Sequence, residues 1–381
     1  MLLELSEAQN NLRETAREFA DKILIPNADR YDRLEEFPKE NIQKLSDLGF
    51  LGIMIPQEHG GLGLDNLALT CALEEIQRGC ASTGVTVSVH NSLVAAPLLH
   101  FGSAKHHEKF LPKLASGEWL CAYAITEPNH GSDAAAIETT CRKKGDRYIL
   151  NGTKAWITNG SYAQVIITFA TLDASKGSKA ICAFIVERDF PGFQVAKKEK
   201  KLGIRASDTV ELIFEDLEVP EENLLCKEGE GFKVAMHTLD GGRIGIATQA
   251  VGIAQACFDE SLKYARERHQ FGKPLEDSQA IRFKIANMAM EIDAARLLTL
   301  RAAALKDAGK PHTQEAAMAK LFASEVANRA ARHAIQIHGG PGVCRGLAVE
   351  RLARDAKITE IYEGTSQIQR LVISRHALGY R

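Results

Sequence analysis

The spacing of apolar residues changes twice along this chain, and that change limits its possible folds more than any single motif. Before residue 120, apolar side chains such as Leu12 and Ala16 recur every three or four positions, which is typical of helices packed on one face. Between 121 and 228 the chain consists of short runs rich in β-branched and aromatic residues, and after 229 the helical spacing returns. The pattern predicts three domains, which we place at 1–120, 121–228 and 229–381.

Turn-forming residues subdivide the first two domains. Pro26, Pro38 and the glycine-rich loop 60–63 interrupt the first helical pattern, so we expect helices to end at these points. In the middle domain, Asn151-Gly152 separates the apolar runs 148–150 and 154–157, which is a strong sign of a tight hairpin. We therefore expect the middle domain to be a mostly antiparallel β-domain.

The last domain carries the longest helical patterns. Ile281, Ile285, Met288 and Ile292 share one helix face, and residues 316–337 are rich in good helix formers. Helices of this kind can pack as a bundle. The fold class we expect is a multidomain α+β protein with an N-terminal α-helical domain, a central antiparallel β-domain and a C-terminal helical bundle.

Composition argues against several kinds of function. The net charge of -2 and the pI near 6.6 provide no positive surface for DNA or RNA, and no segment approaches the ~18 apolar residues of a membrane span. The cysteines form no Cys-x-x-Cys pair, and neither His106-His107 nor the spacing of His333 and His338 suits a metal site, so we assign no metal. The segment 1–7 lacks the pattern of a secretory signal, and secretion is not expected.

Two glycine-rich segments do not fit a classical dinucleotide-binding fold. Residues 340–346 nearly match G-x-G-x-x-G, but the last glycine is one place late and the preceding residues have a helical pattern. Residues 241–245 also lack a preceding strand. Any nucleotide must therefore be held in another way.

Glu363 lies just before an expected helix. Gly364 permits a turn, and Ser366 with Gln369 forms the Ser-x-x-Gln pattern of a capping box, so we expect a helix to begin near Ser366. Apolar side chains precede the carboxylate, and partial burial would raise its pKa toward that of a general base. The alternative is a solvated acid in a surface turn, and the rarity of buried glutamates favours it when these residues are taken alone.

Four ordered segments together resemble one protein family. They are Tyr123-Ala-Ile-Thr-Glu-Pro-Asn-His-Gly-Ser-Asp133, Trp156-Ile-Thr-Asn-Gly160, Arg266-Glu-Arg-His-Gln-Phe-Gly-Lys-Pro-Leu275 and Tyr362-Glu-Gly-Thr-Ser366. The resemblance is to the flavin-dependent acyl-CoA dehydrogenases, nearest to their short-chain (butyryl-CoA) branch, and it covers nearly the whole chain. That family has a helical N-terminal domain, a central β-domain and a C-terminal four-helix bundle, so the resemblance implies the same order here.

The resemblance implies a reaction for Glu363. In the family, the glutamate of the Tyr-Glu-Gly-Thr motif removes the α-proton of an acyl-CoA thioester while the β-hydrogen leaves as hydride to the flavin. Glu363 would be this catalytic base, with FAD as the cofactor, and the product would be the trans-2-enoyl-CoA of a short or medium acyl chain. The family further implies a homotetramer, a dimer of dimers, that passes its electrons to electron-transferring flavoprotein. Branches with the base on a different helix, such as the isovaleryl-specific enzymes, are disfavoured.

The resemblance also implies which residues contact FAD. Those along the flavin ring are Tyr123, Ala124, Ile125, Thr126, Glu127, Pro128, Asn129, His130, Gly131, Ser132, Trp156, Ile157 and Thr158. Those toward the pyrophosphate and adenosine are Arg268 and Gln279, together with Gln336, Ile337, His338, Gly339 and Gly340 from a second subunit, and Thr365, Ser366 and Gln367 complete the site. Taken singly, Trp156 could be a core aromatic, Thr126 a satisfied β-residue, and Arg268 a surface ion-pair partner of Glu267 or Asp277.

For the substrate, the family pattern points to residues along the CoA arm and thioester: Ser132, Asp240, Gly241, Gly242, Arg243 and Gly364. Arg243 can instead brace the bundle near Glu363. Two departures from the pattern leave the acyl group open: Asn129-His130 stands where small residues are usual, and Val343-Cys344-Arg345-Gly346 replaces the usual sequence after Gly-Gly-x-Gly.

Other functions stay open from the sequence. A dehydrogenase or oxidase specialised for branched, cyclic or aromatic acyl-CoA would have the same motifs, and rapid reoxidation of its flavin by air would identify the oxidase. A nucleic-acid-binding flavoprotein relative would need a basic face, which the net charge does not support. We expect a cytoplasmic protein of a bacterium or, if a transit peptide has been removed, a protein of the mitochondrial matrix.

Overall fold

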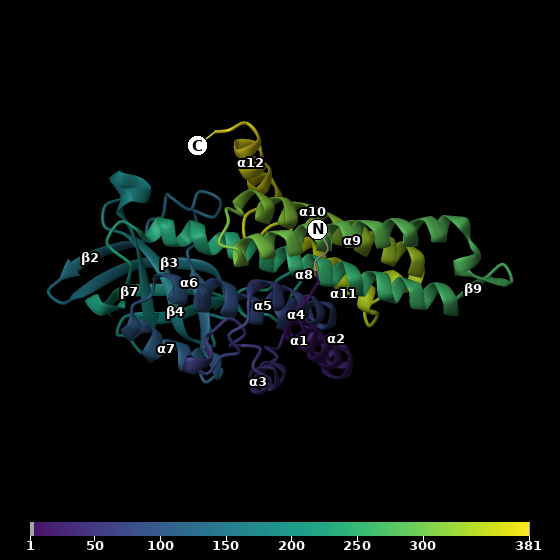
Figure 1. Ribbon diagram of the computed structural model, residues 1–381, viewed down its shortest axis with the longest axis horizontal. Coiled ribbons are helices and arrows are strands. Elements are labelled where there is room, and N and C mark those ends of the chain that lie inside the picture. Colours follow the sequence, from purple (N-terminus) through teal and green to yellow (C-terminus); the bar gives the residue numbers. More distant parts are fainter. Residues whose placement is uncertain (1–3, 381) are drawn as a thin grey trace.

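The protein consists of a β-domain flanked in sequence by two helical domains (Figure 1). The computed structural model describes residues 4–380, so Met1, Leu2 and Leu3 of the amino-terminal segment considered above lie outside the described residues. The predicted order of helical, β and helical domains is confirmed. The first strand begins at Leu120 and the first helix of the last domain begins at Gly231, beside the boundaries that we proposed.

The N-terminal domain is helical, and Pro26 does not interrupt it. The chain is helical from Glu7 to Leu34, because a π-helical turn at Ala20–Leu24 precedes the proline. The wider π turn relieves the clash and the lost hydrogen bond that proline causes within an α-helix. The interruptions at Pro38 and at 60–63 are confirmed. The α-helices are α1 (Glu7–Phe19), α2 (Ile25–Leu34), α3 (Lys39–Asp47), α4 (Asn66–Gly79), α5 (Ala81–Ser88), α6 (Ala96–Phe101) and α7 (Ala104–Ala115), with a second π-helical segment at Val89–Ala95.

The middle domain is built on one mixed sheet. Its strands are β1 (Leu120–Ala124), β2 (Thr140–Lys144), β3 (Arg147–Thr158), β4 (Ala163–Thr171), β5 (Ile181–Glu187), β6 (Phe193–Lys198), β7 (Thr209–Pro220) and β8 (Leu224–Leu225). The order is β6-β7-β3-β2-β4-β5-β8, with β1 beside β4. Only the β1–β4 and β2–β4 pairings of this sheet are parallel among the described residues, so the prediction of a mostly antiparallel domain is confirmed.

The predicted hairpin at Asn151-Gly152 is wrong, because both apolar runs belong to the single strand β3. The register of β3 against β7 shifts between Leu150 and Gly152, which marks a β-bulge rather than a turn. Glycine is needed in the bulge, since a Cβ at Gly152 would lie 2.5 Å from the Thr139 hydroxyl oxygen. The hairpin turn lies instead at Gly145, between β2 and β3.

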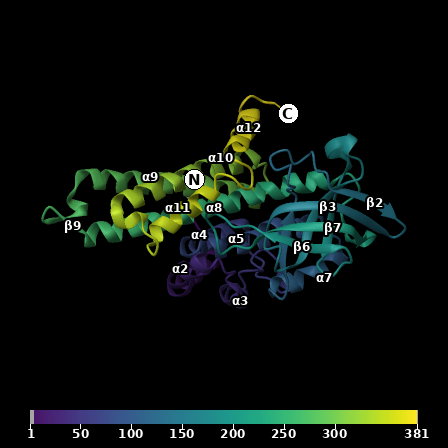
Figure 2. The ribbon, with the colours of Figure 1, turned by 180° about the vertical axis from the view of Figure 1, so that it is seen from behind.

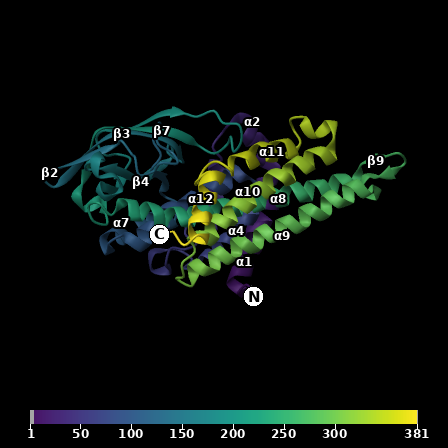
Figure 3. The same ribbon diagram turned by 90° about the horizontal axis from the view of Figure 1, so that it is seen from above.

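The C-terminal domain is a helical bundle with α8, α9 and α10 side by side (Figures 1 and 3). Met288 and Ile292 of the predicted apolar face are buried on α9, and the predicted helix 316–337 lies within α10. No helix among residues 4–380 has the length and apolar character that crossing a membrane requires. The helices are α8 (Gly231–Glu267), α9 (Gln279–Asp307), α10 (Thr313–His338), α11 (Ala348–Ile358) and α12 (Ser366–Ala377), and the small hairpin of β9 (His269–Gln270) and β10 (Lys273–Pro274) joins α8 to α9.

The three domains meet around the first half of α8. One buried cluster contains Leu93 of the second π-helical segment, Tyr123 of β1 and Val234 of α8. In Figures 1 and 2 the N-terminal helices lie on one side of the bundle and α12 stands on the other. A side chain at this junction can therefore contact residues of all three domains.

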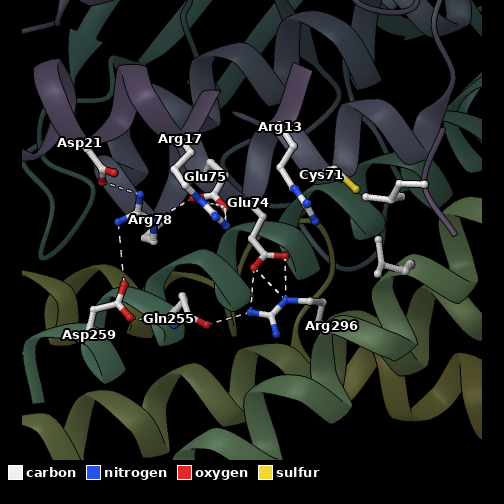
Figure 4. Close-up of a pocket in the computed structure, with 12 residues that line it drawn as sticks. Arg13, Arg17, Asp21, Cys71, Glu74, Glu75, Arg78, Gln255, Asp259 and Arg296 are labelled. Carbon is white, nitrogen blue, oxygen red and sulfur yellow. Dashed lines mark hydrogen bonds and ion pairs between the residues drawn. The ribbon is translucent and has the colours of Figure 1, made fainter. Parts of the chain in front are cut away.

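Ion pairs link the N-terminal helices to the bundle across a cavity of about 540 Å³ (Figure 4). The Glu75 carboxylate accepts from Arg17 at 2.5 Å and from Arg78 at 2.9 Å, although Glu75 itself is nearly buried. Arg296 of α9 donates to Glu74 of α4 at 2.8 Å. The Arg17–Glu75 pair therefore joins α1 to α4, and the Arg296–Glu74 pair joins α4 to the bundle. Losing one partner of such a partly buried pair would leave its counterpart uncompensated.

Candidate active site

Glu363 occupies a strained turn between α11 and α12. Its φ is 55°, and Gly364 follows at 88°, so two successive residues have left-handed backbone. A non-glycine residue pays about 1–2 kcal/mol for this conformation. Surrounding bonds hold the turn: Gln369 Nε2 donates to the carbonyls of Glu363 and Gly364 at 3.1 and 2.8 Å, and Lys320 Nζ donates to the Gly364 carbonyl at 2.6 Å. These bonds hold the strained backbone in place, and this backbone conformation fixes the direction of the Glu363 side chain.

The helix after this turn begins at Ser366, as predicted, but the predicted capping box is wrong. The N-cap is Thr365, whose hydroxyl oxygen accepts from the Ile368 amide at 3.3 Å. Gln369 is fully buried, and its amide nitrogen is engaged by the two carbonyls of the turn. Gln369 therefore supports the turn that holds Glu363 rather than the helix terminus.

Glu363 is partly exposed as a residue, but one oxygen of its carboxylate is buried. This oxygen, Oε2, accepts no hydrogen bond from the residues that the structure describes. Gly242 of α8 approaches so closely that a Cβ there would lie 2.2 Å from this oxygen and 2.8 Å from Leu93 Cδ2. Glycine at 242 leaves the carboxylate its space, and the alternative of a solvated surface acid is wrong.

Burial raises the pKa of Glu363 from its usual 4.5 to about 7, and the positive charges of Arg243 and then Lys320 oppose the rise. Lys320 is itself fully buried on α10, and burial lowers its pKa to about 8. Near neutral pH the carboxylate is therefore poised between its two protonation states. A group with these properties can exchange a proton with a neighbouring carbon acid.

Arg243 is placed to brace the bundle, one of the two roles considered for it. It lies within α8, is nearly buried, and donates to Asp240 at 2.6 Å. The second oxygen of Asp240 accepts from the Thr313 hydroxyl of α10, also at 2.6 Å. Arg243 thus joins two helices of the bundle and acts on Glu363 through its charge.

The raised pKa of Glu363 predicts a gain in stability when its charge is removed. The folded protein holds the Glu363 proton up to pH about 7 and the unfolded chain only up to 4.5, so stability from this group falls as pH rises between these values. This difference between the folded and unfolded pKa values corresponds to a loss of ~3 kcal/mol in the free energy of unfolding at pH values where Glu363 is ionised in both the folded and the unfolded state. We expect Glu363→Gln to unfold at higher denaturant than wild type at pH 8 and at a similar concentration at pH 4. Equal midpoints at pH 8 would show that the carboxylate is not desolvated.

A buried ion pair fixes the loop that follows β1. Lys154 of β3 donates to Glu127 at 2.7 Å, and the same carboxylate accepts from the backbone amides of Glu138 and Thr139 at 2.5 and 3.0 Å. Both partners of the ion pair are almost completely buried. The loop from Pro128 to Ser132 is thereby held at the surface beside β3, with His130 near Glu138 at 3.2 Å.

Trp156 projects from a bulge in β3. The register against β7 shifts between Lys154 and Ile157, and Trp156 has a φ of 62°. Its side chain is 59% exposed, so the alternative of a core aromatic is wrong. The nearby Thr126 and Thr158 are partly exposed, and their hydroxyls make no hydrogen bond within the described part of the chain. The bulge therefore presents an aromatic face with hydroxyl groups beside it, which suits a planar heteroaromatic ring.

Thr365, Ser366 and Gln367 lie at the start of α12 beside Glu363, whereas the remaining predicted cofactor residues lie at the opposite end of the bundle. Arg268 and Gln279 flank the β9–β10 hairpin, which Figure 1 shows far from β3. The segment Gln336–Gly340 ends α10 at the same place, since the His338 ring stacks on Tyr264 of α8 with centroids 4.1 Å apart. Arg268 forms no ion pair within residues 4–380, so its predicted alternative partners are wrong. Within one chain, the residues of the predicted FAD site therefore form two groups that lie far apart.

Some of the predicted substrate residues are exposed and others are buried. Ser132 is exposed on the loop after β1, whereas Gly241 and Gly242 are buried on α8 near the turn that contains Gly364. The unusual segment 343–346 is largely exposed at the far end of the bundle, so it does not contact Glu363.

Sequence reasoning missed Lys320 and Leu93, and it gave Gln369 a role at the helix terminus instead of in the turn. A signal existed for Lys320, because it shares a helix face with Ala316, Ala323 and Ala327, which are all buried. A lone lysine on such a face needs a buried acceptor, here the Gly364 carbonyl. No local pattern marks Leu93, which reaches Glu363 only through packing between domains.

Family models match each domain of the chain. The model described as acyl-CoA dehydrogenase, N-terminal domain, matches residues 6–118, the middle-domain model matches residues 122–217, and the C-terminal-domain model matches residues 229–378. Together these matches cover nearly all described residues.

Individual proteins are similar along their whole length. The short-chain specific acyl-CoA dehydrogenase of rat mitochondria is 53% identical over 376 residues, covering 99% of this chain and 91% of the relative. The butyryl-CoA dehydrogenase structure from Megasphaera elsdenii has a TM-score of 0.98 at 45% identity, covering 99% of this chain and 100% of the other. A chain in a structure described as the electron transferring flavoprotein of Acidaminococcus fermentans has a TM-score of 0.98 at 48% identity, with the same coverage.

Proposed function

The chain belongs to the acyl-CoA dehydrogenase family, and on that premise we propose that it oxidises short-chain acyl-CoA thioesters to trans-2-enoyl-CoA with Glu363 as the base. The observation that carries the proposal is the buried Oε2 of Glu363, which has no hydrogen-bond partner in the described chain and belongs to a group with a pKa of about 7. A structural carboxylate would be paired, because an unpaired buried acceptor is costly.

The residues around Glu363 support removal of an α-proton. Above pH 7 the carboxylate is mostly ionised, and its raised pKa brings it closer to that of a weak carbon acid. The Glu363 backbone N–H donates no hydrogen bond within the described chain, so it is free to hold the thioester oxygen as negative charge develops. Arg243 and Lys320 favour the ionised base through their positive charges, while their side-chain hydrogen bonds go to Asp240 and the Gly364 carbonyl.

FAD is the cofactor of this family, and when bound it accepts the β-hydrogen as hydride. The exposed Trp156 and the free hydroxyls of Thr126 and Thr158 fit a flavin ring, and we assign the segments 123–132 and 156–158 to it. The start of α12 fits a pyrophosphate, because Thr365 caps the helix and the Gln367 amide donates no bond within the described residues. We assign Thr365, Ser366 and Gln367 to this part of the site.

A second copy of the chain completes the cofactor site in our proposal. Arg268, Gln279 and the segment 336–340 lie too far along the bundle to join Trp156 within one chain (Figure 1). The outer face of α9 exposes Phe283, Met290 and Leu297, which are 60%, 65% and 53% exposed and seven residues apart. Such an apolar stripe is typical of a helix that packs against another chain. We propose a homotetramer formed as a dimer of dimers.

Short acyl chains are favoured by the packing beyond Glu363. One helical turn past Gly242, a Cβ at Gly245 would lie 2.5 Å from the Ser88 hydroxyl oxygen of α5. The two helices are thus in contact one turn away from Gly242, and we propose that this contact limits the length of the acyl tail. The name of the rat relative agrees with this limit. We propose that electrons leave through an electron-transferring flavoprotein, the protein for which one similar structure is named.

A panel of acyl-CoA thioesters tests the proposed substrate class. Anaerobic mixing with butyryl-CoA is expected to bleach the flavin at a rate at least ~10-fold above that with octanoyl-CoA, a difference of about 1.4 kcal/mol in the barrier. Branched, cyclic and aromatic thioesters belong in the same panel. Faster bleaching with any of these than with butyryl-CoA would replace the short-chain assignment, and rapid reoxidation by air would indicate an oxidase.

A further inference from the structure

We propose that Gln249 of α8 is a positioning residue for the reaction, because it holds the Tyr362 side chain and thereby sets the direction of the peptide between Tyr362 and Glu363. The inference rests on the proposed role of Glu363 and extends it to a side chain outside the turn. The peptide that Gln249 positions leads directly into the proposed base and carries the backbone N–H proposed to hold the thioester oxygen.

The Gln249 amide has a partner at each end. The side chain is completely buried on α8, where residues 244–254 are all buried. A buried amide is costly unless its polar atoms are paired. Here Nε2 donates to the Ala81 carbonyl at 3.1 Å, and Oε1 accepts from the Tyr362 hydroxyl. One side chain therefore joins the start of α5 in the N-terminal domain to the residue before Glu363.

The backbone that enters the turn has few hydrogen bonds of its own. Within residues 4–380, neither the Tyr362 nor the Glu363 backbone N–H donates a hydrogen bond. The backbone that leaves the turn is held differently, by side-chain donors to the carbonyls of Glu363 and Gly364. The Tyr362 hydroxyl is therefore the polar anchor on the entering side, and Gln249 is the group that holds it.

The Tyr362 ring is fixed by packing. It lies against two buried clusters, one in the bundle and one at the junction of the three domains. Burial and then the charge of Glu363 raise the pKa of Tyr362 well above its ordinary value, so the phenol stays protonated and able to donate. With the ring packed in this way, the acceptor on α8 determines where its hydroxyl is held.

Loss of this hydrogen bond is expected to affect the chemical step. The strained backbone of Glu363, with a φ of 55°, follows directly after Tyr362. A misplacement of about 1 Å at a reacting group can cost ~10²-fold in rate. An interaction that counts in the transition state lowers the rate when it is lost, without weakening the binding of substrate in the ground state.

Anaerobic flavin bleaching by butyryl-CoA tests this role on the FAD-loaded enzyme, because it separates the saturating rate from the half-saturating substrate concentration. We expect Gln249→Met and Tyr362→Phe each to lower the saturating rate by at least ~10-fold and to change the half-saturating concentration by less than about twofold. Because both variants lose the same bond, the double variant should be no slower than the slower single variant. Tyr362→Phe removes only a hydroxyl, so it carries the test if Gln249→Met does not fold.

Gln255→Met is the matched control. It makes the same change on the same helix, and Gln255 Oε1 also accepts a side-chain hydrogen bond, from Arg296 at 2.8 Å. We expect the control to bleach at the wild-type rate. A wild-type saturating rate in either Gln249→Met or Tyr362→Phe, losses that multiply in the double variant, or an equal loss in the control would overturn the inference while leaving Glu363 as the base. Wild-type bleaching by Glu363→Gln would remove the proposed base and the inference with it.

Discussion

Glu363→Gln is expected to lower kcat for butyryl-CoA oxidation by ~10²–10⁴-fold, the usual contribution of a general base. The amide keeps the shape that Gly242 and Leu93 accommodate, so the turn and the bound FAD should persist. An amide has no lone pair basic enough to take up the α-proton. Turnover with an artificial electron acceptor measures the loss of kcat, and the absorbance of bound FAD shows whether the cofactor is retained.

Glu360→Gln is the control for this substitution. Glu360 is three residues earlier, and its carboxylate pairs with Lys357 at 2.6 Å. The same chemical change there is expected to leave kcat within about twofold, because an exposed ion pair contributes little. Near-wild-type turnover by Glu363→Gln would show that another group removes the proton.

Mixed assemblies are expected to recover activity from two inactive variants. If one copy supplies Glu363 and Trp156 while its partner supplies Arg268, then neither Glu363→Gln nor Arg268→Ala is active alone. Coexpression with different affinity tags yields mixed dimers in which one of the two symmetric sites is intact. Each mixed dimer within the purified tetramers should have about half the activity of a wild-type dimer, because a two-fold interface creates two equivalent sites.

A second pair of variants controls for simple stabilisation by mixing. Glu363→Gln and Trp156→Ala alter the same half of the site, so their mixed dimers should contain no intact site and regain no activity. Equal activity in the two kinds of mixed dimer, or none in the first, would mean that the halves do not combine across copies.

The periodicity of apolar residues predicted the fold, and the motifs predicted the site. The predictions that were wrong concern local signals that are compatible with two different structures. Asn151-Gly152 can form a turn or a bulge, and only pairing of β3 with β7 selects the bulge. Pro26 ends a helix unless a π turn precedes it, as it does here. Both outcomes depend on partners distant in the sequence.

The properties of Glu363 also depend on distant partners. Ser366 and Gln369 have the spacing of a capping box, yet the Gln369 amide nitrogen donates to the backbone carbonyls of a left-handed turn. Burial of the carboxylate comes from Gly242 and Leu93, which no local pattern connects to residue 363. Motifs could therefore name the base, but its raised pKa had to come from packing.

Isotope exchange tests the central claim, that Glu363 removes the α-proton, apart from flavin reduction. A 3-thia-acyl-CoA has α-hydrogens but sulfur in place of the β-carbon, so no hydride can leave from that position. After incubation with the FAD-loaded enzyme in D2O, mass spectrometry of the recovered thioester reports α-deuterium. We expect wild type to incorporate deuterium with a rate that falls as pH drops through about 7, and Glu363→Gln to incorporate none above the enzyme-free background. Exchange by Glu363→Gln at the wild-type rate would contradict the account.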